Sequence, residues 1–377
     1  MRSGWESKTL DEISINLDSK RIPITKSVRV SGEYPYYGAS GIVDYVADYI
    51  FDEDTLLISE DGANLLARST PIAFPASGKY WVNNHVHILK FENMTTQRFV
   101  ELYLESIPLD DYITGAAQPK LNQNALNSIP IPVPPLPEQQ RVVGILDEAF
   151  DGLATAKANA EKNLQNARAL FENHLQSVFT QRGDGWVEKI FSDICEISSV
   201  LVDPRRKEYL DLPHIGGANI VSKTGELIDL KTAREEGLIS GKFVFDETKV
   251  LYSKIRPYLM KVARPEFRGL CSADIYPLSA EAGQLDRDYL FHLLLSPKFT
   301  EYANAGSARA GMPKVNRDHL FTFHVHLPSV AKQKQLAAKL DALHEETQRL
   351  ESIYQQKLAA LDELKKSLLH EAFTGQL

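Results

Sequence analysis

The sequence "PPLPEQQRVVGILDEAF", from Pro134 to Phe150, has three prolines among its first four residues and then continues as unbroken helix-forming sequence. Proline fixes φ and lacks an N–H, so these residues hold the chain extended, while Pro137 can occupy the first turn of a helix. Beyond it, apolar or small residues recur at alternating steps of three and four as far as Val178. The pattern predicts a globular domain that ends near residue 137, followed by one long helix, which from Glu138 to Thr180 would extend ~65 Å.

The chain repeats itself at roughly half its length. "PKLNQNALNSIPIPVPPLPEQQRVVGILDEAF" from Pro119 matches "PKVNRDHLFTFHVHLPSVAKQKQLAAKLDALH" from Pro313 without a gap, at an offset of 194 residues. At the same offset "FDEDTLLIS" from Phe51 matches "FDETKVLYS" from Phe245. Repeats of this kind indicate a tandem duplication, in which each copy is a globular domain followed by a long helix.

Each globular copy reads as mixed α and β. Stretches such as "TLLISEDG" and "WVNNHVHILKF" alternate in the manner of strands, whereas "RFVELYLESI" and "RDYLFHLLLS" suit helices. We therefore predict an α+β fold. The predicted domains are 1–137 and 183–331, and the predicted long helices are 138–182 and 332–377.

The two long helices each carry a narrow apolar stripe that would stay exposed if the helix stood alone. Pairing the helices within one chain buries both stripes, so we expect an antiparallel coiled coil and an approximate two-fold symmetry. Two similar domains at a set separation match the symmetry of duplex DNA, whose half-sites lie about 34 Å apart or a multiple of that. The stripe of the second helix is predicted at Leu336, Leu340, Leu343, Leu350, Tyr354, Leu358, Leu361, Leu364, Leu368 and Ala372.

The chain resembles the DNA specificity subunits of type I restriction-modification systems. The resemblance rests on "GAAQPKLNQNALNSIPIPVP", "PLPEQQRVVGILD", the Trp-led start of each copy and the terminal "LLHEAFTGQL". It implies two target recognition domains that each read half of a split sequence, joined by helices that set the spacer and bind two methyltransferase subunits. It also implies S-adenosylmethionine in the methyltransferase partner, and ATP and Mg in a restriction partner. The second exit, "HLPSVAKQKQ", departs from the pattern because it lacks the Pro-Pro and Glu-Gln of the first.

Composition excludes several other classes. The net charge of -8 argues against a protein that coats nucleic acid without selectivity, and no apolar run approaches the ~20 residues that span a membrane. The N-terminus lacks a signal-peptide core, so we expect a cytoplasmic protein. The two isolated cysteines, Cys195 and Cys271, have the spacing of neither a disulfide framework nor a zinc site.

Motifs for catalysis are missing from the sequence. The segment "VPPL" at 133–136 lacks the polar and aromatic residues of a methyltransferase site, and there is no phosphate-binding loop. Glu-x-Lys triplets at 6–8 and 363–365 occur by chance at this charge content. The pairs His85 with His87 and His324 with His326 could share a strand face and bind metal, but no third ligand is apparent nearby. We expect a chain without catalytic residues, metal or cofactor of its own.

Candidate DNA contacts follow from the residue types that reach phosphates and base edges. The segment from Lys249 to Arg268 holds six cations, one anion and interleaved tyrosines. In the second copy we predict contacts from Tyr252, Ser253, Lys254, Arg256, Tyr258 and Lys261, with Arg205, Arg206 and Lys207 as further phosphate candidates. The matching segment of the first copy gives Ser59, Glu60, Asp61, Asn64 and Arg68. A polar-aromatic group adds Tyr36, Tyr37, Lys79, Asn83, Asn84 and His85, and the equivalent lysines Lys120 and Lys314 complete the set.

Two other functions compete with the reading of DNA. One is a modification enzyme with its own active site, which binding of a labelled methyl donor to the chain would support. The other is a coiled-coil adaptor whose repeated domains bind proteins, which mobility shifts on duplexes with split targets would distinguish.

Overall fold

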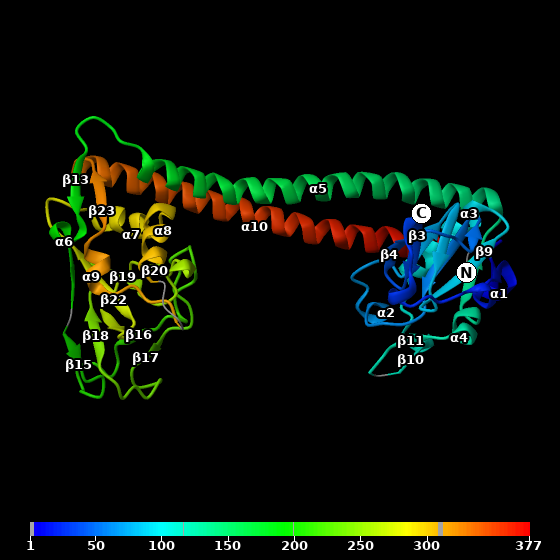
Figure 1. The fold of residues 1–377 in the computed structure, drawn as a ribbon, viewed down its shortest axis with the longest axis horizontal. Coiled ribbons are helices and arrows are strands. Elements are labelled where there is room, and N and C mark those ends of the chain that lie inside the picture. The colour runs from blue at the N-terminus through cyan, green and yellow to red at the C-terminus, as the bar shows by residue number, and fades with distance from the viewer. Residues whose placement is uncertain (1–3, 116, 199, 308–311) are drawn as a thin grey trace. The chain divides into compact units, whose positions relative to one another are not determined.

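The computed structural model describes residues 4–115, 117–198, 200–307 and 312–377. The chain forms two compact units. Unit 1 comprises the residues up to Glu161 together with Gln356–Leu377, and unit 2 comprises Lys162–Gln355. Each unit holds one globular lobe and one end of each long helix (Figure 1). We call residues 4–133 of unit 1 lobe 1, and residues 185–327 of unit 2 lobe 2.

Lobe 1 is built on two four-stranded sheets. The first has the strand order β2-β9-β6-β7, and the second has the order β4-β3-β8-β5. The strands of the first sheet are β2 (Ser14–Asn16), β9 (Val86–Phe91), β6 (Thr55–Ser59) and β7 (Ala73–Ala76). Those of the second are β4 (Gly41–Val46), β3 (Ser31–Gly38), β8 (Lys79–Val82) and β5 (Phe51–Asp52). Two further pairs are β1 (Glu6–Thr9) with β12 (Pro130–Val133), and β10 (Ile113–Thr114) with β11 (Lys120–Leu121). The helices are α1 (Leu10–Ile13), α2 (Asn64–Ala67), α3 (Met94–Ser106) and α4 (Gln123–Asn127).

Lobe 2 repeats the first sheet and replaces the second. The order β14-β22-β19-β20 reproduces that of lobe 1, whereas the other sheet has five strands in the order β15-β18-β21-β16-β17. The repeated sheet contains β14 (Cys195–Ile197), β22 (Ile275–Ala280), β19 (Lys249–Ser253) and β20 (Val262–Ala263). The five-stranded sheet contains β15 (Leu201–Val202), β18 (Lys242–Phe245), β21 (Gly269–Cys271), β16 (Pro213–Ile215) and β17 (Lys231–Thr232). The remaining elements are β13 (Val187–Ile190), β23 (His324–Leu327), α6 (Phe191–Ile194), α7 (Arg287–Leu295), α8 (Pro297–Ala305) and α9 (Arg317–Phe321).

The sequence repeat therefore corresponds to a repeat of structure. β6 and β19 lie 194 positions apart and each is a central strand with partners on both sides. The short helices α4 and α9 are equally spaced, and each begins at an asparagine whose side chain accepts an N–H of the first turn, Asn122 from Ala125 and Asn316 from His319. The predicted mixed α and β character is confirmed.

One predicted strand region is divided in two. β8 ends at Val82 and β9 begins at Val86, because Asn83 Oδ1 accepts the backbone N–H of His85 at 2.8 Å and turns the chain. The alternating letters of "WVNNHVHILKF" continue through this turn, so alternation alone does not reveal it.

The long helices are α5 (Leu136–Thr180) and α10 (Val330–Thr374), each of 45 residues. They run antiparallel. In unit 1 Lys157 Nζ lies 2.9 Å from Asp362 Oδ1, and in unit 2 Arg168 Nε lies 2.9 Å from Glu351 Oε2. The positions advance by 11 residues along α5 while they retreat by 11 along α10, so both units use the same antiparallel register. The predicted intramolecular coiled coil is confirmed.

The apolar seam follows the predicted stripe with one exception on α10. Leu340 and Ala372 are buried, but Leu364 is 47% exposed. Lys365 takes the position toward α5, where its Nζ lies 5.4 Å from the centre of the Phe150 ring and 3.5 Å from Glu105 Oε1. The stripe shifts here because a helix of 3.6 residues per turn drifts from a seven-residue repeat.

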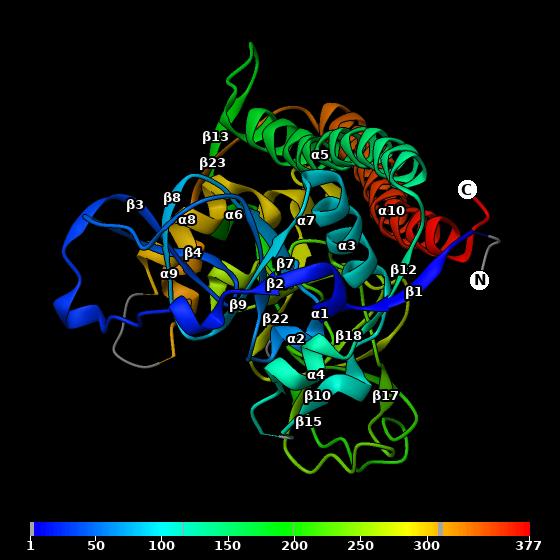
Figure 2. The ribbon, with the colours of Figure 1, turned by 90° about the vertical axis from the view of Figure 1, so that its right-hand side faces the viewer.

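In unit 1, α3 packs against the start of α5 and the end of α10 (Figure 2). Phe99 of α3 is 1% exposed, and its ring centre lies 5.2 Å from that of Phe373 and 6.0 Å from that of Trp5. Val142 of α5 and Leu369 of α10 belong to the same apolar cluster. Lobe 1 is therefore joined to the helix pair by a continuous core.

Unit 2 has the corresponding arrangement around α7. The end of α5 and the start of α10 contribute Phe179 and Leu340 to the core cluster of lobe 2. The ring centre of Phe179 lies 5.0 Å from that of Tyr289. Lobe 2 is therefore also rooted in the helix pair of its own unit.

An aspartate on each long helix reinforces this packing. In unit 1, Arg98 of α3 donates to Asp147 Oδ1 from Nε at 2.9 Å and from Nη2 at 2.7 Å. The positions 194 residues later are His292 and Asp341, and His292 Nε2 lies 2.8 Å from Asp341 Oδ1.

The charges of the second pair follow from its surroundings. Burial opposes ionisation of Asp341, but hydrogen bonds from His292 and Arg264 outweigh it and lower the pKa of this carboxyl to about 2. Burial lowers the pKa of His292, so a neutral ring donates its Nε2 proton to the carboxylate.

A buried glutamine fixes the beginning of each long helix. Gln139 Nε2 donates to the carbonyl of Pro134 at 2.8 Å, and Gln333 Nε2 donates to that of Pro328 at 2.9 Å. Each side chain also reaches the N-terminus of a lobe helix, since Gln139 Oε1 accepts from Thr96 and Gln333 Oε1 accepts from the Asp286 N–H. The second exit lacks the glutamate of the Glu-Gln pair, but Gln333 occupies the position equivalent to Gln139.

We expect Gln333→Ala to lower the free energy of unfolding by about 1–3 kcal/mol, because the part-buried Asp286 N–H loses its acceptor and the fully buried Gln333 side chain is removed. Denaturant unfolding of the purified chain measures this change. Gln335→Ala, at an exposed position two residues along the same helix, is the matched control and should change stability by less than about 0.5 kcal/mol. Equal losses from both variants would contradict the structural role given to Gln333.

Candidate nucleic-acid interface

Both lobes contain the same backbone junction, where the end of a central strand meets two other segments. Junction 1 is formed by residues 59–62, 84–86 and 119–121, and junction 2 is formed by residues 253–256, 273–275 and 313–315. Isolated β-bridges join Asp61 to Lys120 in the first and Ile255 to Lys314 in the second, again 194 positions apart.

Backbone hydrogen bonds of nearly equal length hold the two junctions. In junction 1, Gly62 N donates to Pro119 O at 3.0 Å and Leu121 N donates to Glu60 O at 2.8 Å. The equivalent bonds of junction 2 are Arg256 N to Pro313 O and Val315 N to Lys254 O, both 2.8 Å. A third bond runs to the turn before the neighbouring strand, from Glu60 N to His85 O at 2.9 Å and from Lys254 N to Asp274 O at 3.0 Å. The main chain is therefore common to both sites.

The last residue of each strand-end segment has a positive φ. Gly62 has φ +108° and Arg256 has φ +50°. Glycine accepts a positive φ freely, whereas for arginine the left-handed region costs ~1–2 kcal/mol. A strained non-glycine residue of this kind persists where the surrounding bonds fix it and is a reason to look for function.

Junction 1 carries acidic side chains that are already paired. Glu60 accepts from Arg21 Nη1 at 2.5 Å, and its Oε1 lies 3.1 Å from Lys120 Nζ. Burial opposes ionisation of Glu60, but these two hydrogen bonds outweigh it and lower the pKa of its carboxyl. Asp61 Oδ2 lies 2.7 Å from His85 Nδ1, and the His85 side chain is 47% exposed. Glu60 is only 8% exposed, so this predicted contact is largely covered, and the accessible side chains of junction 1 are Asp61, Lys120 and His85.

Buried hydrogen bonds of His87 support the backbone of junction 1. His87 Nδ1 lies 2.5 Å from Asp18 Oδ2, and His87 Nε2 lies 2.8 Å from the carbonyl oxygen of Leu121. Both nitrogens of this ring are therefore used in protein contacts. Across the part of the chain that the structure describes, no group of three or more His, Cys, Asp or Glu is placed to hold a metal ion.

Junction 2 carries the opposite balance of charge. Lys254 Nζ donates to the carbonyl of Ala273 at 2.5 Å and lies 3.8 Å from Asp274 Oδ1, while Lys314 Nζ lies 3.5 Å from the same oxygen. Burial and the nearby Lys314 ammonium lower the pKa of Lys254, an effect that Asp274 opposes. One carboxylate thus faces two lysines, and the exposed Arg317 adds a third cation close to Lys254.

Arg256 and Tyr258 extend from junction 2 toward solvent. Arg256 is exposed and Tyr258 is 52% exposed. These two residues and Lys314 retain the accessibility that a DNA contact needs, and they stay predictions as contacts.

Three predicted contact residues lie in the core instead. Tyr252 is 1% exposed, Ser253 is 2% exposed and Ser59 is 1% exposed. Tyr252 packs edge-on against Phe299, with ring centres 5.4 Å apart. β6 and β19 are central strands, and the side chains of Thr55–Ser59 and of residues 250–253 are buried. We therefore withdraw these three residues as direct contacts.

Two more predicted residues hold loops of lobe 1 together. Asn64 bonds to Ser69 and Thr70, and Arg68 donates to the carbonyls of Leu104 at 3.2 Å and Ile107 at 3.0 Å. The guanidinium thereby satisfies the last carbonyls of α3. Both side chains are used in these contacts, so neither is available to DNA as placed.

The polar-aromatic group divides between two places. Asn83 and Asn84 lie in the turn beside junction 1, and Asn84 is exposed. Tyr37 is half-buried, with its ring centre 6.0 Å from that of Phe74, and burial raises the pKa of its hydroxyl. Lys79 begins β8, at the opposite end of that strand from the turn, and lies over the Tyr49 ring. The group is therefore not one site.

The other cations predicted in lobe 2 have partners of their own or lie elsewhere. Lys261 Nζ donates to the carbonyl of Gly217 at 2.5 Å. Arg205 pairs with Asp203 at 2.8 Å. Arg206 and Lys207 are exposed beside it.

Sequence reasoning missed two cations at these junctions. Arg21 lies 39 residues before Glu60 in the sequence, so no local sequence pattern indicates this contact. Arg317 follows Lys314 by three residues in "PKVNRDHL", whereas the first copy has Gln123 at the matching position. That difference between the copies is a signal that an internal comparison could have used.

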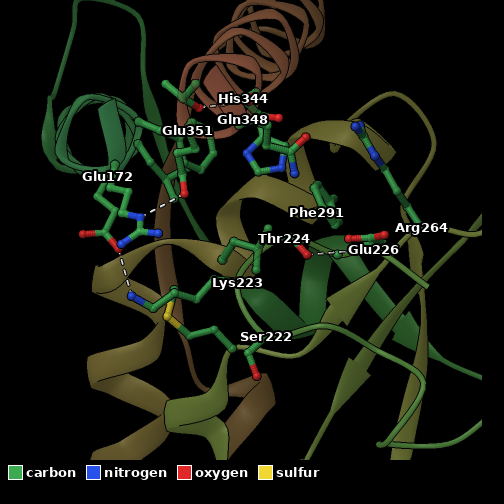
Figure 3. A pocket seen from close by; sticks show the side chains of 18 of the residues that line it. Glu172, Ser222, Lys223, Thr224, Glu226, Arg264, Phe291, His344, Gln348 and Glu351 are labelled. Atoms are coloured by element: carbon green, nitrogen blue, oxygen red, sulfur yellow. Dashed lines mark hydrogen bonds and ion pairs between the residues drawn. The ribbon is translucent and has the colours of Figure 1, made fainter. Parts of the chain in front are cut away.

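An open groove of about 1420 Å³ lies in unit 2 between lobe 2 and the long helices (Figure 3). Lys223 Nζ lies 2.8 Å from Glu172 Oε1, and Arg168 Nε lies 2.9 Å from Glu351 Oε2. The lining carries both signs of charge, so it is not the uniformly positive surface that a phosphate backbone favours. We assign no nucleic acid to this groove.

No helix within the four described ranges is long and apolar enough to cross a membrane.

The family described as "Type I restriction modification DNA specificity domain" matches residues 2–165 and 183–359 of the chain. The chain is 24% identical to the type I restriction enzyme EcoDI specificity subunit of Escherichia coli, over 99% of this chain and 88% of that protein. It is 19% identical to the type I restriction enzyme MjaVIII specificity subunit of Methanocaldococcus jannaschii, over 99% and 93% of the two chains.

Two solved structures share the fold. One comes from a study of complex assembly and conformational transition of the type I R-M system, with a TM-score of 0.72, 16% identity and coverage of 100% and 99% of the two chains. The other is the HsdS subunit from Thermoanaerobacter tengcongensis, with a TM-score of 0.60, 16% identity and coverage of 100% and 98%. Since the family match includes both repeats and most of the sequence, the chain belongs to the type I restriction-modification DNA specificity subunits.

Proposed function

We propose that lobe 1 and lobe 2 each read one half of a split DNA sequence through junction 1 and junction 2. The observation that carries this proposal is the duplicated junction. Equivalent backbone hydrogen bonds hold the two junctions, but the side chains at matching positions differ. A common main chain with unlike side chains suits two readers of different short sequences, because direct readout depends on the donors and acceptors presented to base edges.

In this proposal the chain has no active site and the antiparallel helices bind two methyltransferase subunits. S-adenosylmethionine belongs to those subunits, and ATP and Mg belong to a restriction subunit where one is present. The complex acts on double-stranded DNA, and we propose that it does so in the cytoplasm.

Methylation sequencing of the source strain with and without this gene tests the proposal. We expect a bipartite methylated sequence that disappears from the deletion strain and returns with the gene. The complex with the methyltransferase should then bind a duplex with both halves at least about a thousandfold more tightly than one with both halves scrambled. An unchanged methylome would contradict the proposal, and binding of labelled methyl donor to the purified chain alone would contradict its non-catalytic part.

A further inference from the structure

We propose that Arg256 is a specificity-determining residue that reads a guanine in the half-site of lobe 2. This inference rests on the proposed function and assigns one base contact within it. An arginine fork pairs with guanine O6 and N7 in the major groove, which is the commonest specific contact between proteins and DNA.

The guanidinium of Arg256 is available for such a contact. Its neighbours Lys254 and Lys314 share Asp274, and Lys261 donates to the carbonyl of Gly217. Over the residues that the structure describes, Arg256 is exposed and its side chain has no hydrogen-bond or ion-pair partner. Among the cations of junction 2, Arg256 thus keeps its charge and its five donors free of partners in the described part of the chain.

The backbone of Arg256 is held on both sides. Its N–H donates to Pro313 O at 2.8 Å, and its carbonyl accepts from Leu259 N at 2.9 Å. Pro257 follows and begins the short 3-10 helix η4 (Pro257–Leu259), which restricts the next φ. The left-handed conformation at φ +50° is therefore fixed before any ligand binds. Such preorganisation reduces the entropy lost when the side chain meets a base edge.

Neighbouring side chains are suited to the phosphates beside that base. Lys314 and Arg317 are both exposed, on the segment that bridges to the residue before Arg256. Phosphate contacts fix register without reading sequence, whereas a planar fork reads the base. Junction 2 thus combines two cations for phosphate contacts, Lys314 and Arg317, with one residue that reads a base, Arg256.

Lobe 1 provides an internal comparison. The position equivalent to Arg256 is Gly62, which has no side chain, and the residues around it are Glu60, Asp61 and His85. Lobe 1 therefore makes no arginine contact at this register, and the guanine requirement should apply to one half-site only.

The experiment compares the wild-type complex with Arg256→Gly and Arg256→Lys complexes, each assembled with its methyltransferase partner. Arg256→Gly installs the residue of junction 1 and relieves the positive φ, so folding of this variant is not at risk from backbone strain. Lys314→Ala is the matched control for a phosphate contact. Binding is measured on the wild-type target, on duplexes with each base pair of the second half-site changed, and on duplexes with each guanine replaced by 7-deazaguanine.

We expect the wild-type complex to lose roughly ten- to a hundredfold in affinity when one guanine of the second half-site is changed, and a smaller factor when its N7 is removed. Arg256→Gly should no longer discriminate at that position and Arg256→Lys should discriminate less, because lysine lacks the planar fork, while discrimination in the first half-site stays intact. Lys314→Ala should weaken binding to all sequences alike and reduce the salt dependence.

An Arg256→Gly complex that still discriminates at every base of the second half-site would overturn the inference, and so would a second half-site without guanine. Neither result affects the proposed function, which would fail only if the wild-type complex did not distinguish the split target from a scrambled duplex.

Discussion

Replacing residues 1–137 with the corresponding lobe of a specificity subunit that has another target is expected to change one half of the methylated sequence and leave the other half as it was. The reason is that each lobe has its own cores and its own junction. Methylation sequencing of a strain that carries the chimeric gene measures both halves at once. This is the largest effect we expect, since recognition of one half-site is exchanged completely.

The chimera must keep the contacts by which lobe 1 meets the helix pair. Arg98, Phe99 and Leu102 of α3 pack against or bond to the long helices of unit 1, so these residues should be retained in the transplanted lobe. The reciprocal exchange of residues 183–331 is the control and should change the opposite half. A change of both halves by a single exchange would contradict the independence of the two lobes.

Phe99→Ala should lower the free energy of unfolding by about 3–5 kcal/mol. Phe99 is 1% exposed and joins α3 to Phe373 at the end of α10, so truncation leaves a cavity where lobe 1 is rooted in the helix pair. Thermal or denaturant unfolding of the full chain measures the loss. We also expect weaker recognition of the first half-site at temperatures where the wild type is still folded.

Met94→Ala is the matched control for this variant. Met94 begins the same helix and is 50% exposed, so its loss should change stability by less than about 0.5 kcal/mol. A Phe99→Ala protein as stable as the control would contradict the view that α3 holds lobe 1 on the long helices.

Much of the scaffold could be predicted from the sequence because its signals are local and repeated. The heptad stripe identified both long helices, and their burial requirement predicted the antiparallel pair. The constant offset of 194 residues predicted equivalent elements in the two copies, and β6 with β19 and α4 with α9 have this spacing. Such patterns predict structure well because the formation and packing of helices and strands depend on the periodicity of apolar residues more than on individual side chains.

The candidate site was less accessible to prediction. Alternating letters in "KVLYS" do not distinguish a central strand from an edge strand, so Tyr252 and Ser253 looked as available as Arg256. The partners of Glu60 come from residues 39 positions before it and 60 positions after it, which only the folded sheet brings together. Which cations are already engaged depends on these distant contacts, and no local pattern encodes them.

The junctions are held by main-chain bonds, and this has a consequence for how such proteins acquire new targets. Side chains at positions 60, 61 and 85, or at 254, 256 and 274, can be replaced by mutation while the amide and carbonyl groups that shape the loop stay the same. Natural selection can therefore explore new preferences in one lobe without first repairing its folding. After the ancestral gene was duplicated, the two lobes could diverge separately, so that the two halves of the recognised DNA sequence could become different.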